Sequence, residues 1–113
     1  MLTLASRNPL SPAVEIRVNF GIFAGRQATP AELDDLAHAL LPIVPDVSIV
    51  SEQRREVGLG SEAALEQVRV EVAQEDLPEE ELEVERMIGR LLQETERWAQ
   101  ACIAERHAEV TEV

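Results

Sequence analysis

The sequence predicts one α+β domain whose elements follow the order β-α-β-β-α, with three strands in a sheet and two helices on one face. Three observations predict this class. Apolar and polar residues alternate at 14–22 and at 66–72, which is the period of a strand with one buried face. A capping box begins a helix at Thr29, and a segment of helical period ends near residue 107. Because 113 residues suffice for one core, we expect a single domain at 14–113 after a mobile N-terminal arm at 1–13.

The strand predicted at 14–22 has an apolar residue at every even position and a polar residue or glycine at every odd one. Successive side chains of a strand point to opposite faces. One face is therefore expected in the core, and the other, with Glu15, Arg17 and Asn19, toward solvent or a partner. The two prolines within residues 1–13 interrupt any regular period, which is why those residues are predicted to be a mobile arm.

The first helix is predicted from a Thr-Pro-Ala-Glu motif at residues 29–32. The Thr29 hydroxyl can accept the Glu32 amide proton, while the Glu32 carboxylate reaches back to the Thr29 amide. Pro at the first helical position already has a helical φ angle. Pro42 and Pro45 end the helix. Its apolar stripe is Leu33, Leu36, Ala37, Leu40 and Leu41.

Two further strands are predicted at 47–57 and 66–72, joined as a hairpin around Gly58 and Gly60. The polar second half of the first of these strands is expected to project beyond the helices. The resulting order, with a right-handed crossover, is that of a ferredoxin-like unit that lacks its last strand. The strand at 14–22 would then lie at an open edge, available for strand addition by the arm or by a partner.

The long C-terminal helix predicts a homodimer. About thirty residues in a helix span about 45 Å, whereas a compact domain of this size is about 34 Å across. The helix should therefore overhang the sheet. Leaving large apolar side chains of the overhang in water costs about 1.5–3 kcal/mol each, so a second copy of the chain is expected to cover them. The residues predicted in this dimer helix are Leu91, Trp98, Cys102 and Ile103.

Composition excludes several kinds of chemistry. All ten basic residues are arginine, and the chain contains no tyrosine, so lysine Schiff bases, Walker-type phosphate loops and tyrosine acid/base catalysis are absent. One cysteine and two histidines do not complete a structural zinc site. We expect no metal, no cofactor and no catalytic activity. Without a recognisable signal segment or a long apolar run, the chain is expected in the cytoplasm.

The negative charge is concentrated in the last third of the chain. The net charge is −12, of which residues 71–113 contribute −9 and residues 1–70 contribute −3. Binding to nucleic acid releases counterions only from a cationic protein surface, and anionic lipid likewise attracts basic segments. Direct binding to nucleic acid or to a membrane is therefore not expected, whereas a basic protein partner is electrostatically compatible.

One loop is a candidate for binding a small anion. It joins the strand at 14–22 to the first helix and contains Gly25, Arg26 and Thr29. The free amides at a helix N-terminus attract anions, and a guanidinium adds charge-assisted hydrogen bonds. One glycine and one arginine are also what an ordinary turn contains, so both interpretations stay open.

The open face of the predicted sheet is a candidate partner surface. It would present Arg17, Arg54 and Arg69 among glutamates on neighbouring strands. Guanidinium groups are planar donors suited to recognition, although alternating charge also stabilises strand pairing on a solvated face. The pair Asp34 and His38, one helical turn apart, is interpreted as an exposed surface pair rather than a metal or acid/base site.

Three hypotheses for function follow. The first is a small acidic protein–protein interaction or adaptor module that forms a homodimer. The second is an acidic inhibitor or immunity-type protein that blocks a basic, nucleic-acid-binding partner, because residues 75–85 contain seven acids and carboxylates can imitate phosphates. The same acids also complement the helix dipole. The third is a domain that binds a small anion at the loop of Gly25 and Arg26.

Overall fold

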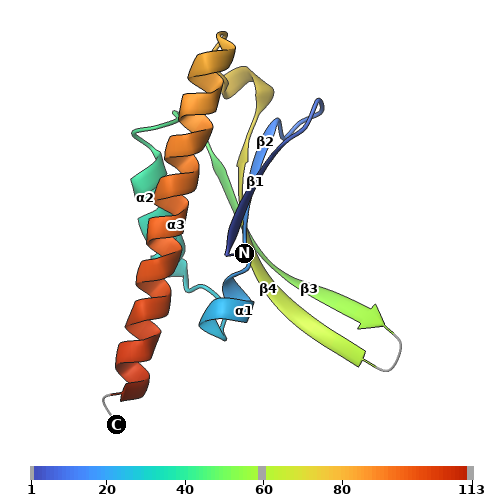
Figure 1. Ribbon diagram of the computed structural model, residues 1–113, viewed down its shortest axis with the longest axis vertical. Helices are drawn as coiled ribbons and strands as arrows, with labels where there is room; N and C mark the ends of the chain where they lie inside the picture. The colour runs from blue at the N-terminus through green and yellow to red at the C-terminus, as the bar shows by residue number, and fades with distance from the viewer. Residues whose placement is uncertain (1, 59–60, 112–113) are drawn as a thin grey trace.

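The computed structural model describes residues 2–58 and 61–111, with side chains described except at 53–65 and from 105 onward. It contains a four-stranded antiparallel sheet in the order β1-β2-β4-β3. The helices α2 and α3 lie on the same side of this sheet (Figure 1). The strands are β1 (Thr3–Arg7), β2 (Val14–Val18), β3 (Ser48–Gly58) and β4 (Ser61–Val72), and the helices are α1 (Phe20–Ala24), α2 (Pro30–Leu40), the 3₁₀ turn η1 (Gln74–Asp76) and α3 (Glu81–Thr111).

The prediction of a mixed α+β chain with a long C-terminal helix is confirmed, but the prediction of three strands is wrong. The fourth strand is β1, which comes from the arm at 1–13 and pairs with β2 from Thr3 opposite Val18 to Arg7 opposite Val14. It occupies the edge that the sequence predicted to be open. Mobility of the arm, the domain boundaries and the ferredoxin-like assignment stay predictions.

A second correction concerns the end of β2, which stops at Val18 rather than at residue 22. The chain continues as the short helix α1, ended by Gly25 at a φ of 72°, a value that favours glycine. Gly21 lies so close to β4 that a Cβ there would be 2.7 Å from the Cβ of Glu66. Phe20 in α1 is still buried, but Ile22, the last apolar residue of the predicted buried face, is 62% exposed, so the alternation predicts burial correctly only as far as Phe20.

The core lies between the helices and one face of the sheet. Glu15 of β2, predicted toward solvent or a partner, is also buried, at 8% exposed, whereas the predicted apolar face is confirmed by Val14, Ile16 and Val18, which are fully buried. Each such side chain contributes about 1.5–3 kcal/mol by leaving water. The other fully buried apolar side chains include Phe20, Leu36, Leu40, Val44, Val68, Val70, Val72 and Leu91.

The predicted hairpin is confirmed, with β3 and β4 paired from Ser48 opposite Glu71 to Gly58 opposite Ser61. Its far end extends away from both helices (Figure 1). The helix α3 is continuous over 31 residues, about 46 Å at 1.5 Å per residue. The chain is accordingly elongated, with extents of 49 × 38 × 21 Å.

Candidate functional site

In the loop predicted to bind a small anion, the donor groups already bind the carboxylate of Glu32 from the same chain. Both terminal nitrogens of Arg26 donate to the carboxylate of Glu32, at 2.6 and 2.8 Å. The same carboxylate accepts from the Thr29 amide at 2.9 Å, while the Thr29 hydroxyl accepts from the Glu32 amide at 3.2 Å. The predicted capping box is confirmed. Binding of an external anion at Gly25, Arg26 and Thr29 stays a prediction, which this arrangement does not favour.

Glu32 also connects the loop to α3. Its side chain is 12% exposed, and the Arg26 guanidinium is the main cause that lowers the pKa of this carboxyl to about 2, with further contributions from Thr29 and from the Cys102 thiol. The indole nitrogen of Trp98 donates to the Glu32 carbonyl oxygen at 2.7 Å. We call Arg26, Thr29, Glu32, Trp98 and Cys102 the Glu32 cluster.

Three of the four residues predicted in a dimer helix are buried inside one copy of the chain. They are Leu91, Trp98 and Cys102, and Trp98 packs against Phe20 with ring centroids 5.4 Å apart. Ile103 is half-buried and packs against the same core. These side chains therefore do not form the solvent-exposed apolar surface on which the prediction of a homodimer was based. The homodimer itself stays a prediction.

On the outer face of the sheet, Arg17 of β2 lies directly opposite Arg69 of β4. Each is neutralised locally, because Arg17 pairs with Glu15 at 2.5 Å and Arg69 pairs with Glu52 at 3.2 Å. The Glu15 side chain is only 10% exposed. The side chain of Arg54, the third predicted member of this face, lies outside the described residues. A partner bound to this face would have to compete with these internal ion pairs.

The pair Asp34 and His38 is exposed, as predicted, and His38 Nδ1 lies 2.8 Å from the Asp34 backbone carbonyl oxygen rather than its carboxylate. Among the residues whose side chains the structure describes, no group of three or more potential ligands among His, Cys, Asp and Glu could hold a metal ion.

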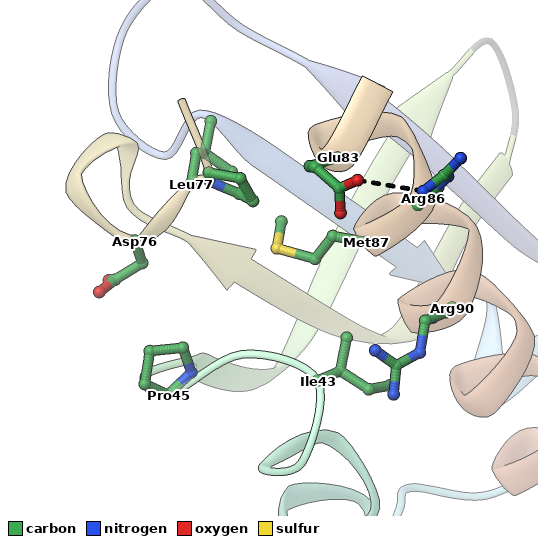
Figure 2. Close-up of a pocket in the computed structure, with 9 residues that line it drawn as sticks. Ile43, Pro45, Asp76, Leu77, Glu83, Arg86, Met87 and Arg90 are labelled. Carbon is green, nitrogen blue, oxygen red and sulfur yellow. Dashed lines mark hydrogen bonds and ion pairs between the residues drawn. The ribbon is translucent and has the colours of Figure 1, made fainter. Parts of the chain in front are cut away.

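A pocket that the sequence did not reveal lies beside the first turns of α3. Its volume is about 410 Å³. Three separate segments form it: the α2–β3 loop, the connection around η1, and α3 itself (Figure 2). Its apolar lining consists of Ile43, Pro45, Leu77, Pro78 and Met87.

The charged residues at the rim of this pocket are not equivalent. Arg86 pairs with Glu83 at 3.1 Å, and the Asp76 carboxylate points away from Met87 and Leu77 (Figure 2). Arg90 lies beside Ile43, and its side chain makes no hydrogen bond or ion pair with any residue that the structure describes. The pocket therefore combines an apolar lining with one guanidinium that keeps its hydrogen-bonding capacity.

A second depression, of about 250 Å³, continues from the first and shares Ile43 and Arg90 with it. Its other lining residues are Ala39, Pro42, Gln93 and Glu94. We call the two together the Arg90 groove. It runs beside α3 from Glu83 to Glu94, with Arg90 in the middle.

Comparison with protein-family models, with curated proteins and with solved structures gives no match for this chain. Within the described part of the chain, no helix has both the length and the apolar character needed to cross a bilayer.

Proposed function

We propose that the protein is a protein–protein interaction module that binds a short extended segment of a partner in the Arg90 groove. The observation that carries this proposal is the Arg90 guanidinium, which has no partner among the described residues and lies beside an apolar lining. A few polar or charged groups in an otherwise apolar depression fix the orientation of a bound ligand, and Arg90 is placed to do this for an amphipathic segment.

The shape of the groove supports a segment of chain as its occupant. Glu83 and Glu94 are eleven residues apart on α3, which corresponds to about 16 Å at 1.5 Å per residue. An extended segment covers that length in about five residues at 3.3 Å each. Because two open depressions share Ile43 and Arg90, the groove suits an elongated occupant better than an enclosed small molecule.

The lining specifies the chemistry of that segment. An apolar side chain such as leucine fits against Met87, Leu77 and Ile43, and a neighbouring carboxylate pairs with Arg90 through charge-assisted hydrogen bonds. The Gln93 amide, which lines the second depression, can donate to a backbone carbonyl. A single carboxylate is favoured over an acidic run, because the net charge of −12 repels strongly acidic segments.

The expected affinity is modest. Burying one leucine side chain contributes about 1.5–3 kcal/mol, and an exposed ion pair contributes at most about 1 kcal/mol. Association and ordering of a flexible segment oppose these gains. The two contributions sum to at most about 4 kcal/mol, so we expect a dissociation constant of about 1 mM or weaker, which corresponds to a transient interaction.

Capped pentapeptides with a central leucine next to glutamate, in both sequence orders, test the proposal. Binding is followed by NMR through the methyl groups of Ile43 and Met87. We expect these signals to shift with the glutamate peptide and much less with its glutamine and lysine counterparts. Arg90→Gln should weaken binding about fivefold, or about 1 kcal/mol. The matched control is Arg17→Gln on the outer sheet face, which should bind as wild type.

Three results would overturn the proposal. The first is equal binding of the glutamate and lysine peptides. The second is loss of binding in Arg17→Gln together with unchanged binding in Arg90→Gln. The third is octanoate binding to the groove at least about tenfold more tightly than any peptide, which would make the groove a small-molecule site.

A further inference from the structure

We propose that a second copy of the chain pairs with the free edge of β1, so that two four-stranded sheets join into one across a two-fold axis. β1 is an edge strand in the sheet order β1-β2-β4-β3. All five of its residues pair in regular register with β2. Within Thr3–Arg7 it has no proline, no bulge and no lysine, three of the devices that protect edge strands, and its one charged residue, Arg7, lies at the end of the strand and pairs with Glu81. This interface is separate from the Arg90 groove.

The backbone of β1 offers a defined set of donors and acceptors. The Leu2 carbonyl accepts from the Asn19 amide, and the Asn8 amide donates to the Ala13 carbonyl, both at 2.9 Å. In an antiparallel pair, alternate residues direct their amide and carbonyl groups to the same neighbour. The groups of the even-numbered residues therefore face β2, and those of Thr3, Ala5 and Arg7 face the free edge.

This set is self-complementary. When two β1 strands pair antiparallel about an axis at Ala5, Ala5 of one copy exchanges both hydrogen bonds with Ala5 of the other. Thr3 of one copy then lies opposite Arg7 of the other and exchanges both hydrogen bonds with it. Every outward amide and carbonyl of the three residues gains a partner, which is a reason to expect a second copy rather than an unrelated strand.

The side chains on the helix-facing side of β1 are complementary in the same register. Arg7 pairs with Glu81 of its own α3, and the Thr3 hydroxyl donates to Glu96 of the same helix. Because Thr3 of one copy lies opposite Arg7 of the other, each Arg7 comes beside Glu96 of the second copy. The guanidinium would then lie between two carboxylates, one from each chain, on both sides of the axis.

Helix α3 supplies an apolar contact near the axis. Glu81 and Glu96, which contact β1, lie on one ridge of the helix with Ile88 and Leu92, since these positions are separated by steps of three and four. Both Ile88 and Leu92 are half-buried. On the opposite side of the sheet, Leu4 of β1 is 55% exposed. A second copy at the β1 edge would cover the remaining exposed parts of these three side chains.

Sedimentation equilibrium with charge-reversed variants tests the interface. The wild-type chain should sediment as a dimer of about 25 kDa, twice the 12.5 kDa of one chain, at concentrations of about 20 μM. Arg7→Glu places like charges beside Glu96 of the other copy, and Glu96→Arg places like charges beside Arg7. Each variant alone should therefore sediment as a monomer.

An equimolar mixture of the two variants should restore the dimer, because opposite charges then face each other on both sides of the axis. This recovery also shows that neither variant is simply unfolded. A wild-type monomer at about 100 μM, variants that stay dimeric alone, or a mixture that stays monomeric would each overturn the proposal.

Discussion

Two arginines lie beside apolar side chains in different regions of the molecule, and they differ in their ion pairing. Arg26 donates to both oxygens of Glu32 and lies 5.5 Å from the centre of the Phe20 ring. Arg90 has an apolar neighbour in Ile43 but no carboxylate partner among the described residues. In the Glu32 cluster, the charged groups pair with each other and connect the loop, α2 and α3. In the Arg90 groove, the guanidinium has no such partner, and we propose that it pairs with another molecule. Removing residues from the cluster should lower stability, and removing Arg90 should lower binding.

The largest expected loss of stability comes from Trp98→Ala. Trp98 is 8% exposed, contacts Phe20 and donates to the Glu32 carbonyl. Truncating a buried tryptophan costs about 3–5 kcal/mol. Urea unfolding followed by circular dichroism measures this change. The control is Arg97→Ala on the exposed side of the same helix, expected within about 0.5 kcal/mol of wild type. A loss below about 1 kcal/mol for Trp98→Ala would show that α3 is not fixed through the cluster.

Glu32→Gln should have an intermediate effect that depends on pH. The folded-state pKa of about 2 is below the ordinary value of 4.5. The carboxylate therefore contributes stability above pH 4.5, and this contribution is lost as the pH falls from 4.5 toward 2. Hydrogen bonds to charged groups contribute about 1.5–3 kcal/mol, so the difference between wild type and Glu32→Gln should be of that size at pH 7.

The pH dependence separates this effect from simple disruption of the fold. Unfolding free energies of wild type and Glu32→Gln should converge as the pH falls from 4.5 toward 2. Glu83→Gln, which changes an exposed carboxylate, serves as the control with a small difference throughout. A Glu32→Gln deficit that stays constant down to pH 2 would contradict the role assigned to the ionised carboxylate.

The smallest stability effect should come from Arg90→Gln. Its side chain is exposed and has no partner among the described residues, so the variant should unfold within about 0.5 kcal/mol of wild type. The matched change Arg26→Gln should cost about 1.5 kcal/mol, because it removes two hydrogen bonds from a carboxylate. Thermal unfolding of the two variants side by side compares the regions directly. Equal losses in both would remove the contrast between them.

The sequence predicted those parts of the fold whose side chains follow a single period. β2 and β4 alternate because one face is buried, and the capping box at Thr29 specifies its own hydrogen bonds. Strand addition by the arm was one of two possibilities for the open edge, but the arm itself was not predicted as a strand because the helix-facing residues of β1, Thr3, Ala5 and Arg7, form no apolar row. Two of them are held by α3 through Glu81 and Glu96, a relation between segments far apart in the chain.

The proposed binding site was less accessible to prediction for the same reason. The sequence indicated polar donors in the Arg26 loop, but it did not show that Glu32 would occupy the Arg26 guanidinium, although Glu32 was already recognised in the capping box. The Arg90 groove needs Ile43, Leu77 and Met87 together, and these lie on three segments. In the sequence, Arg90 does not differ from the other arginines of α3. The structure distinguishes it because Arg86 and Arg97 each pair with a glutamate of the same helix.

The contrast between the two arginines is tested most directly by their own side-chain Nε–H signals in the NMR spectrum of the wild-type protein. The glutamate pentapeptide is titrated while the signals of Arg26 and Arg90 are followed together. We predict that the Arg90 signal shifts with saturation and that the Arg26 signal stays in place. A shift of Arg26 with a stationary Arg90 would contradict the account and would return the binding site to the loop at Gly25.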